Sequence, residues 1–383
     1  MVRKKRPEVW EVMAILFFII GIILFIGLVI VHEMGHFLLA RRNGVEVEEF
    51  GIGFPPRAKV LKKVKGTEYT LNWLPLGGFV KLKGEHDADT KKGSYGAASL
   101  PAKLKILVAG VAMNLLAAAI LFTIIAFFGM PKGSLERLPF YDKEQFTIAS
   151  DTTIVTNETY LGFVIEDSPA DRAGLTAGDE VVSIADTEVT SADQFRDLIA
   201  SNSGEDVEIT YVNQSDELVT SSATLNKDFV EGQGRLGVDP VDSTVFRSTW
   251  SAPIVGVVTT FQYADVSLRG LGYVVENLFA GDTEQATQAV GGPVATFKIL
   301  SDTSSLGILY VLFVVALISV SLAVINILPI PALDGGRAFV TLLFRGLRKP
   351  LTKSTEELIH GTGFVFLMVL IVLITIVDVQ RFF

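Results

Sequence analysis

The residues with the clearest capacity for chemistry form the run His32-Glu33-Met34-Gly35-His36. On a helix, residues four apart share one face, so His32 and His36 can bind one zinc ion with Glu33 beside it. Neutral imidazole nitrogen is a good zinc ligand, and a carboxylate can accept a proton from water that the zinc polarises. With only 4 histidines in the chain, chance explains this pattern poorly, and we interpret it as a catalytic Zn²⁺ site.

A catalytic zinc usually has three protein ligands and one open position, so one ligand remains to be found. The chain has no cysteine, which excludes thiolate ligands, disulfides and cysteine nucleophiles. His86 and His360 lie in polar connecting segments and fit surface positions better. Asp334 is the better candidate, because prolines and glycines break the helix between Asn326 and Gly336. Irregular backbone at membrane depth is tolerated where it lines a buried or wet cavity.

Four apolar stretches are long enough to cross a bilayer, for which about 20 residues are needed. A mean hydropathy of +0.45 with 49% hydrophobic residues is too apolar for soluble domains alone. We therefore predict a polytopic α-helical membrane protein with spans at Val12 to Val31, Ile106 to Met130, Leu306 to Ile330 and about Gly361 to Val377. The histidine motif directly follows the first span, where ionisable groups are expensive and mark functional sites.

The basic residues at positions 3 to 6 precede an apolar run, as in a secretory signal peptide, but the length of the run and the lack of a cleavage site favour a retained span. Residues 41–105 carry 13 Lys/Arg, residues 329–362 carry 5, and residues 131–307 carry 10 against 28 Asp/Glu. By the positive-inside rule the two basic connections face the cytoplasm and the acidic segment lies outside. The basic N-terminus then lies outside as well, against the same rule.

Two connecting regions have β-like patterns. The stretch from Thr67 to Lys83 alternates in polarity around Gly77-Gly78, which predicts a membrane-associated β-hairpin. From pattern alone, an ordinary cytoplasmic hairpin is an equal alternative. Residues 154–228 predict a small α+β domain, with strands at 161–165, 179–184 and 207–212 and a helix at 191–199 capped by Ser191. Residues 250–305 predict amphipathic helices on the outer membrane face.

The small domain resembles a bacterial-type PDZ domain through Tyr160-Leu-Gly-Phe163, Ser168-Pro-Ala170, Ala173-Gly-Leu175 and Ala177-Gly-Asp179. The resemblance implies a loop whose backbone N–H groups hold a peptide C-terminus. Its members are Tyr160, Leu161, Gly162 and Phe163. A domain that only restricts access to the site is the alternative.

The two motifs at the ends of the first and third spans together resemble the site-2 protease family of intramembrane zinc metalloproteases. They are His32-Glu-x-x-His36 and Asn326-x-x-Pro-x-Pro-x-Leu-Asp-Gly335. The PDZ-like insert resembles the bacterial branch that includes the regulator-of-sigma-E protease. Further matches are Ala109 to Asn114 and Gly292-Pro293, while Val111 stands where the family often has proline.

This resemblance implies a role for each site residue. His32, His36 and Asp334 are zinc ligands, and Glu33 is the general base. Asn326 contacts the substrate backbone or stabilises an intermediate near the metal. Gly77 and Gly78 belong to a hairpin that holds substrate as an added strand.

The function that follows is hydrolysis of single-span membrane proteins, such as pre-trimmed anti-sigma factors or remnant signal peptides, in regulated intramembrane proteolysis. We expect a multi-pass protein of the bacterial inner membrane, in contact with lipid and with no nucleic-acid partner. The site lies near the cytoplasmic side and the PDZ-like domain outside. The predicted divisions are 1–130, 131–249, 250–305 and 306–383.

Two other classes remain. A scaffold built on a PDZ module would need neither Glu33 nor Asp334, and a metal transporter would need more polar residues within the spans than Asn114 and Ser321.

Overall fold

The computed structural model describes residues 7–132, 135, 138–165, 167–213, 217–228, 234–304 and 306–382. The basic residues at positions 3 to 6 lie outside this part of the chain. The chain divides into two compact units. The first, here called the sheet domain, comprises Phe127–Gly133 and Thr147–Trp250 together with Met1–Pro7, and the second, the helical unit, comprises Glu8–Ala126, Ser134–Phe146 and Ser251–Phe383.

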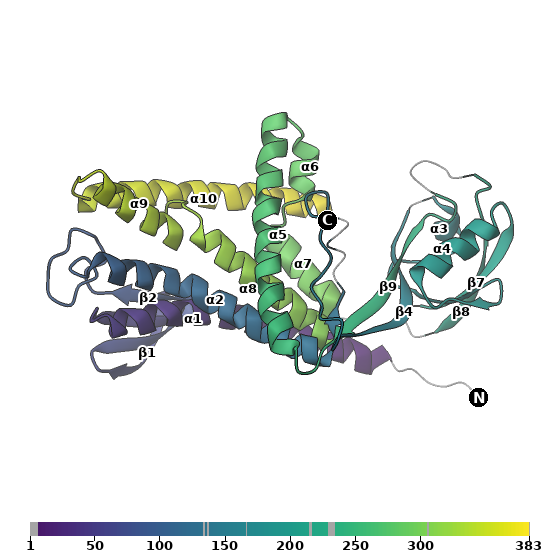
Figure 1. The fold of residues 1–383 in the computed structure, drawn as a ribbon, viewed down its shortest axis with the longest axis horizontal. Coiled ribbons are helices and arrows are strands. Elements are labelled where there is room, and N and C mark those ends of the chain that lie inside the picture. Colours follow the sequence, from purple (N-terminus) through teal and green to yellow (C-terminus); the bar gives the residue numbers. More distant parts are fainter. Residues whose placement is uncertain are drawn as a thin grey trace. The chain divides into compact units, whose positions relative to one another are not determined.

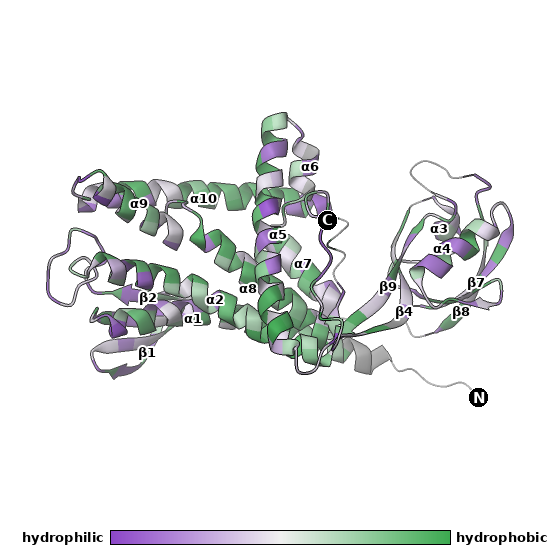
Figure 2. Ribbon diagram, viewed as in Figure 1, coloured by the Kyte–Doolittle hydropathy of each residue, from purple (hydrophilic) through white to green (hydrophobic). Residues whose placement is uncertain are grey.

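Eight helices account for most of the helical unit among the described residues (Figure 1). They are α1 (Pro7–Arg42), α2 (Leu100–Phe128), α5 (Ala252–Ala280), α6 (Thr283–Gln288), α7 (Pro293–Ser304), α8 (Ile308–Ile327), α9 (Asp334–Gly346) and α10 (Lys353–Phe382). Four of these are long and apolar enough to cross a membrane: α1 from Val12, α2, α8 and α10. Their apolar character is visible in Figure 2, where green predominates along them and purple is found mainly toward their ends. Each of the four predicted spans falls largely on one of these helices, and the helix α10 is longer than the fourth predicted span.

The histidine motif lies near the end of α1, and the aspartate motif lies where α8 ends and α9 begins. The apolar run of α1 continues through the histidines to Arg41 and Arg42, and the chain then turns at Gly44, whose φ is +77°. The helix α8 ends at Ile327, and its cap residue Leu328 is extended because Pro329 and the following prolyl segment cannot continue a helix. A new helix, α9, begins at Asp334 itself.

The strands β1 (Val47–Val64) and β2 (Thr67–Leu82) form a sheet of their own in the helical unit. The turn lies between Val64 and Thr67, so the prediction of a simple hairpin centred on Gly77-Gly78 is wrong. Ile52 instead pairs with Leu71 on one side and with Gly78 on the other. The start of β1 thus lies between the two halves of β2, and residues 78–82 form an edge.

The sheet domain contains a seven-stranded sheet in the order β3-β9-β4-β5-β7-β8, with β6 beside β5. Its strands are β3 (Met130–Pro131), β4 (Thr153–Val164), β5 (Glu180–Ile184), β6 (Thr187–Glu188), β7 (Asp206–Val212), β8 (Leu218–Thr224) and β9 (Val238–Arg247). Two short helices join them, α3 (Pro169–Arg172) and α4 (Ala192–Ser201). Ser168 and Ser191 cap these helices by accepting hydrogen bonds from Asp171 N–H and Gln194 N–H.

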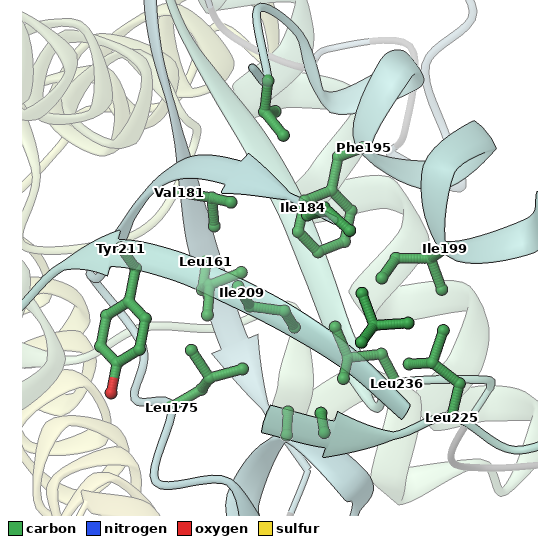
Figure 3. Packing of buried hydrophobic residues seen from close by; sticks show 14 residues of the cluster. Leu161, Leu175, Val181, Ile184, Phe195, Ile199, Ile209, Tyr211, Leu225 and Leu236 are labelled. Atoms are coloured by element: carbon green, nitrogen blue, oxygen red, sulfur yellow. The ribbon is translucent and has the colours of Figure 1, made fainter. Parts of the chain in front are cut away.

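The core of the sheet domain is an apolar cluster drawn from the sheet and from α4 (Figure 3). Phe195 and Ile199 of α4 point into it together with Leu161, Ile184 and Ile209. Leu161 lies in the middle of β4, and its N–H donates to Asp179 O at 2.9 Å. The strand predicted at 161–165 is thus largely part of β4, whereas the binding loop that the PDZ resemblance implies at Tyr160 to Phe163 is strand as well, because Leu161 faces the core and the backbone pairs with β9.

Candidate active site

His32, His36 and Asp334 come together in the helical unit, although the histidines lie on α1 and the aspartate opens α9. The Nε2 atoms of the two histidines are 3.2 Å apart. The Oδ2 atom of Asp334 lies 3.1 Å from His32 Nε2 and 3.2 Å from His36 Nε2. Three potential ligand atoms thus form a nearly equilateral triangle.

This triangle has the size that a tetrahedral zinc site requires. Ligands about 2.0–2.1 Å from zinc in tetrahedral geometry lie about 3.3 Å from one another, close to the distances measured. Two imidazoles and one carboxylate also form a usual catalytic donor set that leaves a position open. The residues present therefore fit zinc.

The helix α2 holds both imidazoles from behind. His36 Nδ1–H donates to the backbone carbonyl of Ile106 at 2.7 Å, which leaves Nε2 free for a metal. The Asn114 amide lies 3.2 Å from His32 Nδ1, and its Oδ1 has no partner among the described residues. With zinc on Nε2, His32 carries its proton on Nδ1, so Asn114 then accepts this bond through Oδ1. This hydrogen bond gives Asn114 Oδ1 a partner and fixes the orientation of the His32 ring.

Close packing of α1 against α2 depends on Gly110. A Cβ atom at this position would lie 2.5 Å from the Nε2 atoms of both His32 and His36. Any side chain here would therefore displace the imidazoles. Gly110 lets α2 approach the histidine face of α1 closely enough for Asn114 to reach His32.

Glu33 faces the edge strand of the β1–β2 sheet. The backbone of Val80 lies within interaction range of its carboxylate. A Cβ at Gly78 would lie 3.7 Å from Glu33 Cγ. Glu33, His36 and Asp334 together line a cavity of about 210 Å³, which residues of the edge strand and of α2 complete. The catalytic candidates thus share one cavity with an open strand edge.

The segment between α8 and α9 is fixed by contacts that position Asp334. The N–H of Ala332 donates to His360 Nδ1 on α10 at 3.1 Å. A Cβ at Gly336 would lie 1.9 Å from Ile330 O, so only glycine allows α9 to start this close to the preceding turn. Burial acts to raise the pKa of Asp334, but hydrogen bonds to the two imidazoles outweigh it and keep this pKa below its ordinary value. The carboxylate is therefore held ionised, as a ligand must be.

The other predicted site residues are not members of this cluster. Asn326 is in the last turn of α8, half-buried, and is not among the residues that line the cavity. Gly77 packs instead beside Phe54 and Val29, where a Cβ would lie 2.9 Å from the Phe54 ring. Tyr160 and Gly162 belong to the sheet domain. Their predicted roles in substrate binding stay predictions.

Sequence reasoning missed two of the residues that support the site. Asn114 was noted only as part of a motif, although a buried amide in an apolar span signals a polar partner. His360 was interpreted as a surface histidine, and no pattern in its own segment reveals that it braces Ala332.

Known proteins resemble this chain along nearly its whole length. A Clostridium perfringens protein whose name assigns it to the zinc metalloproteases is 32% identical over 365 residues, covering 95% of this chain and 98% of its own. The zinc metalloprotease RasP of Geobacillus kaustophilus is 25% identical over 444 residues, covering 94% and 97%. Among solved structures, the PDZ domain of a SdrC-like protein from Listeria monocytogenes is 29% identical, with a TM-score of 0.20, and covers 23% of this chain and 92% of that one.

The family assignment follows from the sequence as a whole. The model of Peptidase family M50 matches residues 20–370 of this chain. This range includes the histidines of α1 and Asp334 at the start of α9. The ligand geometry and the four apolar helices agree with this match. The chain therefore belongs to peptidase family M50 and is a metalloprotease of the membrane.

Proposed function

We propose that this metalloprotease hydrolyses peptide bonds of single-span membrane proteins within or beside the bilayer. The observation that carries the proposal is the shared cavity of Glu33, His36 and Asp334, formed where a candidate span meets an edge strand. A soluble substrate would not require ligands at the ends of apolar helices. The substrate class that we favour is a pre-trimmed membrane protein, such as an anti-sigma factor, or a remnant signal peptide.

Each residue of the cavity has a distinct task. His32, His36 and Asp334 hold zinc, which when bound supplies a Lewis acid beside the scissile peptide. Glu33 accepts a proton from the attacking water and passes it to the leaving amine. The Glu33 carboxylate lines the cavity beside Val80. Asn114 fixes the tautomer of His32.

The edge strand at residues 78–82 supplies a place for an unwound substrate. A membrane helix satisfies its own backbone hydrogen bonds and must lose some of them before a carbonyl becomes reachable. Addition of the substrate as a further strand beside Gly78 to Leu82 offsets this loss. The strand then lies against Glu33, since Val80 contacts both the edge and this carboxylate.

Replacement of the proposed base gives the decisive test. Purified wild type, Glu33→Gln and Glu357→Gln are compared for zinc content and for cleavage of a single-span substrate in detergent micelles. Glu357 is an exposed carboxylate of α10 and serves as the matched control. We expect Glu33→Gln to keep its zinc and to lose cleavage by at least about 1000-fold, whereas the control keeps both. Continued cleavage by Glu33→Gln would refute the assigned role.

A proline tests the substrate strand separately. Gly78→Pro removes a backbone donor from the edge, and Leu61→Pro does the same near the exposed far side of the sheet. We expect the first variant to cleave poorly with normal zinc content and the second to cleave normally. Equal cleavage by both variants would show that the edge strand holds no substrate.

The orientation is part of the proposal. The basic connections lie on the cytoplasmic side and the acidic sheet domain outside, where it screens substrates or binds a peptide terminus. Because the chain has no cysteine, single cysteines report sidedness cleanly. In intact cells, a membrane-impermeant maleimide should label Asp197→Cys but not Lys92→Cys, which should react only after lysis. The reverse pattern would overturn the orientation.

A further inference from the structure

We propose that the connection between α9 and α10 forms a binding site for the phosphate of an anionic phospholipid headgroup. A cavity of about 590 Å³ opens there, separate from the residues of the metal site. Four of its lining side chains are cationic: Arg345, Arg348, Lys349 and Lys353. The hydrophilic colour at this turn contrasts with the green of α10 in Figure 2.

The positive charge of this cavity is largely uncompensated. Among the described residues, Arg345, Arg348 and Lys349 have no acidic partner. The described acid in the lining is Asp87, and its carboxylate is already bound by Lys103, whose side chain is fully buried. A ligand entering the cavity therefore meets at least three cations whose charge is available.

The position of the cavity favours a lipid over a soluble anion. Lys353 is both a lining residue and the first residue of the candidate span α10, so the cavity lies at the level where a headgroup would lie. Leu343 on α9 is 43% exposed, Leu347 directly after α9 is 56% exposed, and Leu358 on α10 is 67% exposed. Such side chains next to the cations offer a surface for acyl chains. Basic pockets beside membrane spans bind anionic headgroups in this way.

The site also has a physical link to the metal centre. The helix α9 begins with Asp334 and ends beside Arg345, so a bound headgroup would hold one end of the helix whose other end carries a ligand. The proposal does not depend on the substrate or on the cleavage mechanism.

Native mass spectrometry of the full-length protein in detergent micelles tests this directly. Wild type, Arg348→Gln/Lys349→Gln and Lys91→Gln/Lys92→Gln are each titrated with phosphatidylglycerol and, separately, with phosphatidylcholine. The control pair is exposed and removes the same charge from another loop of the helical unit. We expect wild type and control to retain one phosphatidylglycerol in preference to phosphatidylcholine. The cavity variant should retain it about 30-fold more weakly, since each basic group near an anionic lipid contributes about fivefold.

A competition experiment separates a lipid ligand from a soluble phosphate. Millimolar glycerol 3-phosphate should not displace the lipid, and displacement would identify a soluble phosphate ligand instead. Equal lipid retention by all three proteins would overturn the site and leave the cations a role in membrane topology alone. Zinc content serves as the check of folding. If the cavity variant loses its zinc, the retention of phosphatidylglycerol by the wild type is measured at increasing salt concentration instead. Binding through these cations must weaken as salt screens their charge, and retention that does not change with salt would overturn the site.

Discussion

The sheet domain and the helical unit both bury apolar clusters, but they differ in the ionisable side chains that they bury. Among the described residues, the sheet domain buries one ionisable carboxylate, Asp179, and it bonds to Thr176, three residues away. The helical unit buries His32, His36, Glu49, Lys103, Glu356 and Asp378 while large apolar side chains cover its exposed surface. Several of its buried bonds span long stretches of chain, such as the one between His32 and Asp334. The sheet domain is therefore held by apolar burial, whereas charged contacts fix the geometry inside the helical unit.

The largest expected effect comes from removing the ligand that joins α1 to α9. Asp334→Ala should lower zinc affinity by at least about 1000-fold, or about 4 kcal/mol, because one of three protein ligands is lost. Cleavage should disappear with the metal. Metal analysis of the purified variant measures this effect, with Asp302→Ala on the exposed face of α7 as the control. A variant that keeps one zinc per chain would contradict the ligand assignment.

An apolar deletion in the sheet domain should act on stability alone. Ile209→Ala removes a fully buried side chain of β7 and should cost about 3 kcal/mol of local stability. Faster hydrogen exchange of the β7 amides in the full-length protein reports the loss. Leu218→Ala, at a position 68% exposed, should change exchange little. Loss of zinc from Ile209→Ala would show that zinc binding in the helical unit depends on the stability of the sheet domain.

A smaller effect is expected at the residue that orients His32. Asn114→Ala removes the amide 3.2 Å from His32 Nδ1 and should weaken zinc binding about 10- to 100-fold. Competition with a chelator of known affinity measures the change. Leu116→Ala, on the exposed face of the same helix, provides the baseline. Unchanged affinity in Asn114→Ala would mean that packing against α2 orients the imidazole without this bond.

The smallest effect concerns the buried carboxylate of the sheet domain. Asp179 accepts hydrogen bonds from Thr176 N–H at 2.7 Å and from Thr176 Oγ1 at 3.0 Å. Asp179→Ala leaves these donors unsatisfied and should cost about 1–2 kcal/mol. Exchange rates in β5 should rise modestly, and those of Asp197→Ala on exposed α4 should not. A cost as large as that of Ile209→Ala would show that this carboxylate does more than close a local turn.

The metal site was predictable from sequence because its information is local. Spacing within one helix places His32 and His36 together, and the broken stretch after the third span singles out Asp334. The β1–β2 sheet was not predictable in the same way, since Ile52 pairs with both Leu71 and Gly78, and a pattern within one segment does not name two partners. The sequence does not predict the strand β9 either, because it lies beyond residue 228 and joins the sheet through pairing with the distant strands β3 and β4. Patterns within a segment do not encode such distant partners.

The separation of His32 from Asp334 by 302 residues also has a consequence for biosynthesis. A chain made from its N-terminus exposes the histidines and Glu33 long before the third ligand is translated. The ligand set is complete only when α9 has followed the third span into place. The complete metal site is therefore a late product of maturation, and a partly made chain has only two of the three ligands.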